Sequence, residues 1–458
     1  MSTFTIRNFG CRATQADAAS IRQSFLARGY SLAETDSIAD LVVLNTCTVT
    51  AAADAEARDA IRRIHRQNPG VRIVVTGCYA QRAPEELAAI EGVAWVIGNS
   101  HQTEIPSFVE GKGLVSIAGL ARHGSLPVQI VREDMRAGRD LEVVSPEDIP
   151  GERTRPTLKI QDGCNHRCAY CVIPFVRGRS RSLLPDRVLA EIRRLVESEA
   201  KEIVLSGIDL GSYGRELSPR TTLYDLIQRI LNESAIERLR LSSIEPMDVT
   251  QDFVNLAAST ERIAPHFHMP LQSGSDRVLR SMHRWYRAAH YARRVEVIHE
   301  RLPHAAIGAD VIAGFPGETE EEHRATMAFI EGLPLAYLHV FSFSAREGTE
   351  ARKLTETVDD GMIHCRAREL RALGEAKAKA FRASQKGRTL RVLTLDRKNR
   401  DWTPAISGNF LKVRLAGRWS RNRWMDIIFD ESDTPLMPLP LELNSPESPE
   451  RRQDFLSE

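Results

Sequence analysis

Three cysteines lie close together in the segment CNHRCAYC, as Cys164, Cys168 and Cys171. Thiolates at such short spacing usually bind one metal centre. A structural zinc site is tetrahedral and closed, so it would need a fourth protein ligand, and no fourth cysteine lies nearby in the sequence. Three thiolates fit an iron–sulfur cluster better, because one iron then stays open for another ligand. The alternative, three unrelated buried cysteines, is disfavoured because this loop holds three of the seven cysteines in the chain.

The elements around this loop predict a barrel. Strands alternate with helices, and six strands are expected at 157–161, 203–206, 239–243, 266–269, 306–313 and 338–343. One of the helices between them opens with a capping box at Thr319 and Glu322. Six strand–helix units predict a (β/α)6 barrel or partial barrel, in which sites lie on the loops that follow the strands. The cysteine loop follows the first strand.

Loops after the other strands are rich in small residues and carry one polar or acidic group each. They read SGID at 206–209, SSIE at 242–245, MPLQSG at 269–274 and GFPGET at 314–319. This composition suits a polar ligand with hydroxyls, an amine and a carboxylate. GFPGET is not a phosphate-binding P-loop, because no Gly-Lys-Ser/Thr follows it. His268 could be a ligand, although a hydrogen-bonded barrel histidine is the simpler interpretation.

A second set of cysteines is spread over the first hundred residues. Strands are expected at 3–9, 41–44 and 72–76, and helices at 14–29, at 52–67 and from Pro84. This alternation predicts a doubly wound parallel sheet. Cys11, Cys47 and Cys78 each follow one of the strands, and the carboxyl ends of parallel strands form the edge where such sheets build their sites. We therefore expect a second three-cysteine cluster site, the alternative being three separate core residues.

Basic residues gather in two places. Arg177, Arg179 and Arg181 follow the cysteine loop, where they could neutralise phosphates or equally pair with nearby carboxylates. The stretch 386–424 holds eleven lysines and arginines against two aspartates, with aromatic residues between them. Strands are expected there at 389–395, 408–415 and 424–429. A small basic β-module with aromatic residues predicts nucleic-acid binding, whereas a solvated basic face is the alternative. Beyond 430 the chain turns acidic and rich in proline, which predicts a disordered tail.

Composition indicates an ordinary globular protein of several domains. The chain has 458 residues, of which 42% are apolar and 27% charged, and its net charge is only +1 because the acidic tail offsets the basic segment. An odd number of clustered cysteines is untypical of a secreted disulfide framework. We see no signal peptide and no apolar run long enough to span a bilayer. The sequence therefore predicts a cytoplasmic protein without membrane contact.

These residues resemble a known family. The C-x3-C-x2-C loop with Tyr170 before its last cysteine resembles the radical S-adenosylmethionine (SAM) enzymes. Its context DGCNHRCAYCVIPFVRGRSRS, the three upstream cysteines and the basic β-module are similar to the methylthiotransferases of that group. The segments NTCTVT and TGCYAQ resemble the branch that modifies N6-threonylcarbamoyladenosine in tRNA. Two positions depart from this branch: Thr14 and Gln15 follow Cys11 where an asparagine is common, and Arg287 replaces the usual threonine.

The resemblance implies two [4Fe-4S] clusters and SAM as cofactors. Cys164, Cys168 and Cys171 would bind the cluster that holds and cleaves SAM, and Cys11, Cys47 and Cys78 an auxiliary cluster that carries the sulfur to be inserted. A radical is needed because the target is an unactivated aromatic C–H bond. The candidates for SAM contacts are Tyr170, Gly207, Ser243, Glu245, Gln272 and Asp310. The candidates for RNA contacts are Arg177, Arg179, Arg391, Lys412, Arg414, Arg421 and Arg423.

The implied architecture is α/β in its first two domains. It comprises a doubly wound parallel domain at 1–105, a linker at 106–155, a radical SAM partial (β/α)6 barrel at 156–385, a small all-β TRAM-like domain at 386–430 and a disordered tail at 431–458.

The implied function is tRNA methylthiotransferase, placing sulfur and a methyl group at C2 of N6-threonylcarbamoyladenosine next to the anticodon. Expected partners are the tRNA anticodon arm, a one-electron reductant such as a flavodoxin-like protein, and a sulfur donor. Alternatives are the same chemistry on isopentenyladenosine in tRNA or on a ribosomal protein. A further alternative is an iron–sulfur RNA-binding protein that does not catalyse.

Overall fold

The computed structural model of the chain describes residues 2–111, 120–123, 126–135, 154–396, 401–432 and 434–439. The chain divides into two compact units, 1–381 and 382–458. The predicted domains at 1–105 and 156–385 thus fall almost wholly within the first unit. Most of the predicted linker, and 440–458 of the predicted tail, lie outside the described residues.

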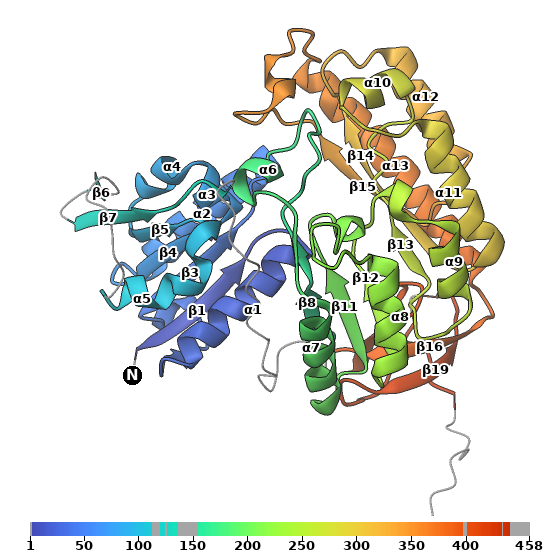
Figure 1. The fold of residues 1–458 in the computed structure, drawn as a ribbon, viewed down its shortest axis with the longest axis horizontal. Helices are drawn as coiled ribbons and strands as arrows, with labels where there is room; N and C mark the ends of the chain where they lie inside the picture. The colour runs from blue at the N-terminus through green and yellow to red at the C-terminus, as the bar shows by residue number, and fades with distance from the viewer. Residues whose placement is uncertain are drawn as a thin grey trace, which may run out of the picture. The chain divides into compact units, whose positions relative to one another are not determined.

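The first part of unit 1 is a mostly parallel seven-stranded sheet (Figure 1). Its strands are β1 (Thr3–Asn8), β2 (Ser31–Leu32), β3 (Leu41–Thr46), β4 (Arg72–Gly77), β5 (Val93–Ile97), β6 (Leu120–His123) and β7 (Leu126–Val131). Their order is β2-β1-β3-β4-β5-β7-β6, and only β6 runs antiparallel to its neighbour. Because β7 pairs in parallel with β5, the sheet extends past residue 105, the predicted end of the first domain.

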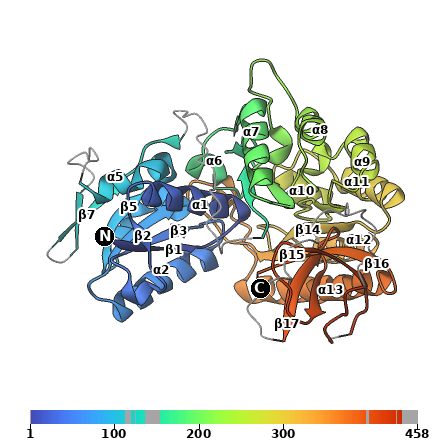
Figure 2. The same cartoon turned by 90° about the horizontal axis from the view of Figure 1, so that it is seen from below.

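Helices cover both faces of this sheet, as Figure 2 shows. They are α1 (Arg12–Leu26), α2 (Ala51–Gln67), α3 (Cys78–Arg82), α4 (Pro84–Ala88) and α5 (Ile105–Val109). Successive side chains of a strand point to opposite faces. Leu41 and Val43 of β3 therefore pack with α1 and α5, whereas Val42 and Leu44 pack with α2 and α4. The doubly wound arrangement predicted from the alternating elements is confirmed.

The rest of unit 1 is a partial barrel of six parallel strands. They are β8 (Thr157–Lys159), β11 (Glu202–Ser206), β12 (Arg238–Leu241), β13 (His266–His268), β14 (Ala306–Ala313) and β15 (Tyr337–Ser342). They form two three-stranded sheets, which isolated bridges between Leu239 and Ile263 and between Ser243 and His268 join. A short antiparallel pair, β9 (Gln161–Asp162) and β10 (Arg181–Ser182), flanks the cysteine loop. All six predicted barrel strands are present.

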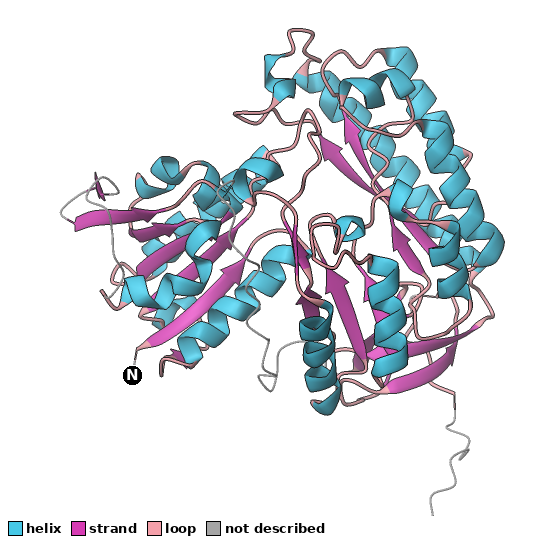
Figure 3. Cartoon of the chain, in the orientation of Figure 1, coloured by secondary structure: helices cyan, strands magenta, loops and turns pink. Residues whose placement is uncertain are grey.

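Helices surround these strands (Figure 3). They are α7 (Pro185–Glu197), α8 (Leu223–Glu233), α9 (Gln251–Ala258), α10 (Asp276–Ser281), α11 (Ala288–Arg301), α12 (Glu320–Glu331) and α13 (Asp360–Ser384). A short helix, α6 (Ile173–Val176), packs instead against α3 of the N-terminal sheet. The predicted capping box at Thr319 and Glu322 opens α12. Apolar residues of α7 and α8 are buried against the barrel strands, which fixes these helices outside it. Within the described residues, no helix combines the length and apolarity that crossing a bilayer would require.

Unit 2 contains a four-stranded antiparallel sheet. Its strands are β16 (Thr389–Thr394), β17 (Trp402–Ser407), β18 (Lys412–Ala416) and β19 (Trp424–Ile428), in the order β18-β17-β16-β19. The sequence analysis missed β17, which contains Pro404, a residue that usually argues against an inner strand. The paired residues of β17 on the β16 side are 405–407, and Pro404 takes part there only through its carbonyl, which accepts from the N–H of Leu395 over 2.7 Å.

Part of the predicted tail is ordered, which corrects the expectation of disorder from 431 onward. Leu436 pairs with Leu415 of β18, and Pro438 pairs with Ile427 of β19. Both are edge strands, whose free backbone N–H and C=O groups accept an additional segment. The acidic, proline-rich composition concealed this because the backbone makes the contacts.

Candidate functional site

The first set of cysteines lies at one edge of the N-terminal sheet. Cys11 follows β1 as the N-cap of α1, Cys47 follows β3 directly, and Cys78 follows β4 as the first residue of α3. These three strands are neighbours, and the direction of winding changes between β1 and β3. Doubly wound sheets bind their ligands at such a switch point. The sheet thus brings together residues that are far apart in the sequence, as predicted.

Two glycines allow the three loops to approach one another. Gly10 has φ +119°, and a side chain there would place its Cβ 2.6 Å from the Cβ of Cys47. Gly77 has φ +97°, and a Cβ there would lie 2.3 Å from the carbonyl oxygen of Thr46. Both conformations are ones that only glycine adopts without strain. The chain before Cys11 therefore passes directly against Cys47.

The chemistry of these thiols suits a metal cluster. Burial, together with the neighbouring thiols of Cys78 and Cys11, raises the pKa of Cys47 to about 12. Burial likewise raises the pKa of Cys78. All seven cysteines are free thiols. Three thiolates this close would repel one another unless a cationic centre balanced them, so the residues fit a cluster bound by three cysteines.

The second set of cysteines lies in the loop after β9. Backbone bonds hold this loop from several sides: Cys164 N donates to Gly178 O, Ala169 N to Met282 O, and Ala351 N to Ala169 O. A cavity of about 390 Å³ opens beside the thiols. Its lining includes all three cysteines together with His166, Phe175, Arg179 and Thr349. Burial raises the pKa of Cys171 to about 12. This set fits a metal centre because three thiols line one cavity, where a bound cation would stabilise their thiolate forms.

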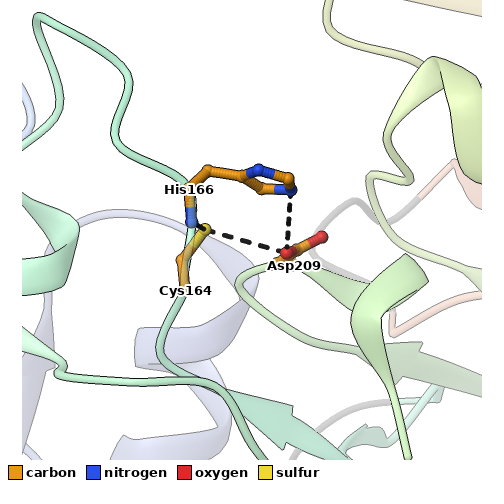
Figure 4. Close-up of side chains that lie close together, drawn as sticks. All are labelled: Cys164, His166 and Asp209. Carbon is orange, nitrogen blue, oxygen red and sulfur yellow. Dashed lines mark hydrogen bonds and ion pairs between the residues drawn. The ribbon is translucent and has the colours of Figure 1, made fainter. Parts of the chain in front are cut away.

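His166 and Asp209 stand beside Cys164 (Figure 4). The imidazole Nε2 of His166 lies 3.3 Å from Oδ2 of Asp209, and the Sγ of Cys164 lies 3.7 Å from the same oxygen. His166 also stacks on Trp285, with ring centroids 5.4 Å apart. A zinc site here would draw on one cysteine only, whereas a cluster bound by the loop would draw on three. The sequence analysis did not select either residue, although Asp209 ends the strand-end segment SGID.

Arg284 is a site residue that sequence reasoning missed. It is buried, and its Nη1 donates to the Sγ of Cys168 over 3.2 Å. Its Nη2 is paired with Glu245, and the guanidinium lies over the ring of Tyr286. Glu245, a candidate for SAM contact, is therefore bound to the arginine that contacts a cluster cysteine. No local signal distinguishes Arg284 from a surface arginine in MHRWYR.

Arg177 corrects a prediction. Its side chain is only 1% exposed, so it cannot contact RNA as predicted. It is paired instead with Asp17 at 2.8 Å and Asp162 at 3.0 Å, the carboxylate alternative that the sequence left open. Its Nε donates to the Sγ of Cys78 over 3.3 Å. Arg179, by contrast, is exposed beside the cavity.

The remaining SAM candidates surround the barrel axis. A Cβ on Gly207 would lie 2.8 Å from the side-chain oxygen of Gln161, which accepts from the backbone N–H of Asp209. The carboxylate of Asp310 accepts from His268 and His339, so His268 is a hydrogen-bonded barrel histidine. Of the other three, Ser243 is exposed, Gln272 adopts φ +72°, and Tyr170 packs edge-on against Phe315.

Three basic residues of unit 2 share one face of its sheet with two tryptophans. The register pairs Leu393 with Ile406 and with Trp424, and Ile406 with Lys412. Because side chains alternate between faces, this face carries Arg391, Lys412, Arg414, Trp402 and Trp424. Arg391 lies over Trp424 at 4.6 Å and Arg414 over Trp402 at 5.8 Å. Arg421 and Arg423 are exposed in the turn before β19. The basic residues 397, 398 and 400 lie outside the described residues.

Two family profiles match separate parts of the chain. Residues 3–98 match the uncharacterized protein family UPF0004, and residues 158–330 match the Radical SAM superfamily. The first range contains Cys11, Cys47 and Cys78, and the second contains the whole cysteine loop.

Curated relatives are similar over most of the chain. Threonylcarbamoyladenosine tRNA methylthiotransferase MtaB of Aquifex aeolicus is 35% identical over 412 residues, which are 89% of this chain and 95% of that protein. The protein of the same name from Bacillus subtilis is 34% identical over 91% of each chain. The tRNA-2-methylthio-N(6)-dimethylallyladenosine synthase of Thermobifida fusca is 32% identical over 94% of this chain and 84% of its own.

Solved structures share the fold at low identity. The radical S-adenosylmethionine methyltransferase TsrM from Kitasatospora setae has a TM-score of 0.53 and 17% identity, covering 75% of each chain. The cobalamin-dependent S-adenosylmethionine radical enzyme OxsB has a TM-score of 0.50 and 14% identity, covering 80% of this chain and 56% of its own. At this identity the likeness concerns the fold alone.

Proposed function

We propose that this chain, which belongs to the radical SAM methylthiotransferase family, modifies N6-threonylcarbamoyladenosine beside the anticodon of tRNA. The enzyme class and its cofactors, two [4Fe-4S] clusters and SAM, follow from the family. The observation that supports the chemistry is the presence of two three-thiol sites in one compact unit. The product would carry sulfur and a methyl group at C2 of the adenine.

We assign one cluster to each cysteine set. Cys164, Cys168 and Cys171 would hold the cluster that binds SAM, and Cys11, Cys47 and Cys78 the auxiliary cluster. When bound, these groups supply two things: a radical that removes a hydrogen atom from an unactivated C–H bond, and the sulfur atom that is inserted there. In the auxiliary set the chain buries Cys47 and Cys78 almost fully and leaves Cys11 exposed. His166, which is paired with Asp209 and stacked on Trp285, lines the cavity beside Cys164.

SAM would bind between the cysteine loop and the strand ends of the barrel, since none of its six candidate contacts lines the cavity beside the loop. The polar groups at the strand ends, among them Ser243 and Glu245, suit its amine, carboxylate and hydroxyls. Tyr170, Gly207, Gln272 and Asp310 complete the proposed pocket.

Two features favour tRNA as the substrate. The exposed sheet face of unit 2 combines Arg391, Lys412 and Arg414 with two tryptophans, a pattern that binds phosphates and stacks bases. The relatives are named for nucleosides of tRNA: those named for threonylcarbamoyladenosine reach 35% and 34% identity, and those named for dimethylallyladenosine reach 33%. We propose contacts to the anticodon arm from this face and from Arg179, Arg421 and Arg423. Such a protein would work in the cytoplasm with a one-electron reductant and a sulfur donor.

Nucleoside mass spectrometry tests the substrate. In tRNA from a strain that lacks the gene, we expect the 2-methylthio form of N6-threonylcarbamoyladenosine to disappear and the unmodified precursor to rise. Wild-type protein should restore it, and a Cys11→Ala variant should not. Loss of the methylthio form of isopentenyladenosine instead would refute the assigned nucleoside but keep the chemistry.

SAM cleavage separates an enzyme from a binding protein. Reduced, cluster-loaded protein should release 5′-deoxyadenosine. If both methylthio-nucleosides are unchanged in the deletion strain while SAM is cleaved, the target is a protein such as a ribosomal subunit. Without either activity, the chain would be an iron–sulfur RNA-binding protein.

The sheet face of unit 2 can be tested by tRNA affinity. Replacing Lys412 and Arg414 by alanine should weaken tRNA binding by about tenfold at low salt and flatten the dependence on salt concentration, because two phosphate contacts are lost. Arg324→Ala, which removes an exposed arginine of α12, is the control. Equal affinity for the double variant and the control would refute this face as the RNA contact.

A further inference from the structure

A buried arginine joins the two cysteine sites. Arg177 follows Cys171 by one short helix, α6, yet its guanidinium contacts the other cysteine set. Each of its nitrogens has a different partner: Nε donates to Cys78, Nη1 to Asp162 and Nη2 to Asp17. Asp17 lies on α1 behind Cys11, and Asp162 lies just before Cys164. One side chain thus connects the N-terminal sheet with both ends of the cysteine loop.

The surroundings fix this side chain. Asp17 and Asp162 also bind Lys159, so Arg177, Lys159 and two carboxylates form a buried network, which Arg181 joins at 3.7 Å from Asp162. Asn99 braces the same place, donating to the carbonyl of Val176 over 2.8 Å and to Cys78 over 3.6 Å. Val176 and Val172 of the loop side pack on Cys78. The guanidinium therefore has one orientation, and that orientation directs Nε at a cysteine sulfur.

We propose that Arg177 is a positioning residue that holds Cys78 and raises the reduction potential of the centre at Cys11, Cys47 and Cys78. This inference rests on the cluster ligands assigned above. A guanidinium stays charged at every working pH. Hydrogen bonds to ligand sulfurs and nearby positive charge favour the reduced, more negative form of an iron–sulfur centre. Arg177 supplies both, and it does so from the segment that carries the other centre.

The position of Arg177 decides which centre it affects. Its Nε reaches Cys78, whereas a different buried arginine, Arg284, contacts Cys168 of the second set. Replacing Arg177 should therefore change the auxiliary centre directly. The centre at Cys164, Cys168 and Cys171 keeps its own arginine.

The test isolates the auxiliary centre in the full-length chain. Protein in which Cys164, Cys168 and Cys171 are replaced by alanine should retain about four irons after reconstitution. In this background the midpoint potential is measured by mediated titration, followed by electron paramagnetic resonance, for Arg177→Gln, Arg177→Lys and Arg187→Gln. Arg187 is an exposed arginine of α7 and serves as the matched control.

We expect Arg177→Gln to shift the midpoint to a more negative value and Arg177→Lys to shift it less, because lysine keeps the charge but cannot hold three partners. Arg187→Gln should not shift it. The proposal is overturned if an Arg177 variant takes up the cluster and its midpoint potential is the same as that of the background protein. If neither variant takes up the cluster, Arg177→Gln is made in the chain that keeps all six cysteines. Loss of the auxiliary centre alone then supports the positioning role, and loss of both centres overturns it. A background protein without iron would instead refute the assigned ligands.

Discussion

The two cysteine sites reach similar chemistry by opposite routes. Cys164, Cys168 and Cys171 are neighbours in one loop, so their spacing alone brings the thiols together. Cys11, Cys47 and Cys78 meet only because β1, β3 and β4 lie side by side and end at the same edge. The ligands of the first site come from one short segment, which later parts of the barrel also hold in shape, and those of the second come from the whole sheet. Damage to the N-terminal fold should therefore abolish one site and spare the other.

Removing a single cysteine should have the largest effect, because it should abolish one site and leave the other. Cys11→Ala should lower the iron content from about eight to about four per chain and reduce methylthiolation to background, while SAM cleavage continues. Cys168→Ala should abolish SAM cleavage and retain the auxiliary centre. Iron analysis and 5′-deoxyadenosine release measure both. Retained methylthiolation in Cys11→Ala would contradict the auxiliary assignment.

A glycine substitution should break the convergent site without touching a thiol. Gly77→Ala places a Cβ 2.3 Å from the carbonyl of Thr46 in a left-handed conformation, so β4 must shift and carry Cys78 with it. We expect loss of the auxiliary centre and about 2–3 kcal/mol of stability. Gly29→Ala is the matched control, because Gly29 also has positive φ but nothing lies within 4 Å.

Gly29→Ala should cost only about 1 kcal/mol and leave the iron content unchanged. Iron analysis and urea unfolding compare the two variants. If Gly77→Ala loads both centres like wild type, close approach at this position is not required for the site.

A buried ion pair tests whether the two sites need each other. Asp54 at the start of α2 accepts from Arg346 over 2.6 Å and from Arg82 over 3.1 Å. Arg346 belongs to the segment after β15, so this pair joins the sheet to the barrel. Asp54→Asn should cost about 3 kcal/mol, since it leaves buried guanidinium groups without their carboxylate.

Both centres should still load in Asp54→Asn, but methylthiolation should fall more than SAM cleavage. Urea unfolding, iron content and product ratios measure these effects. A parallel fall in both activities would indicate general destabilisation.

The smallest effect concerns pH in the metal-free protein. Burial holds the pKa of Cys47 at about 12, above its value in the unfolded chain, so the folded state favours the protonated thiol. This stability is fully present below about pH 9 and is lost as pH rises toward 12. At pH 10 the loss should be about 1.4 kcal/mol for this group.

Cys47→Ser should reduce the difference in unfolding free energy between pH 7.5 and pH 10, because serine does not ionise in this range. Cys171, with a pKa of about 12 for the same reason, should respond equally. A Cys47→Ser variant with the wild-type pH dependence would contradict the burial argument.

Sequence patterns predicted the elements and both thiol sets, but not the groups that surround the thiols. Alternation of strands and helices was sufficient for the sheet and the barrel. The role of Arg177 could not be predicted from the sequence, because the segment VRGRSR does not indicate which of its arginines faces solvent and which pairs with Asp17. Arg284 and Asp209 were missed for a related reason: their partners lie many residues away. The β17 strand was missed because a proline counts against an inner strand. The sequence does not show that Pro404 takes part through its carbonyl alone, without an N–H.

The backbone bonds of the cysteine loop set an order of events during synthesis. Ala169 sits between two cluster cysteines, and its N–H and C=O are held by Met282 and Ala351. The ribosome delivers both partners long after the loop itself. The loop can therefore take its final shape only when the last barrel strand is in place. A nascent chain that already exposes all three thiols does not yet hold them in the geometry that binds a cluster. Loading of this centre belongs to the end of folding, even though its ligands are neighbours in the chain.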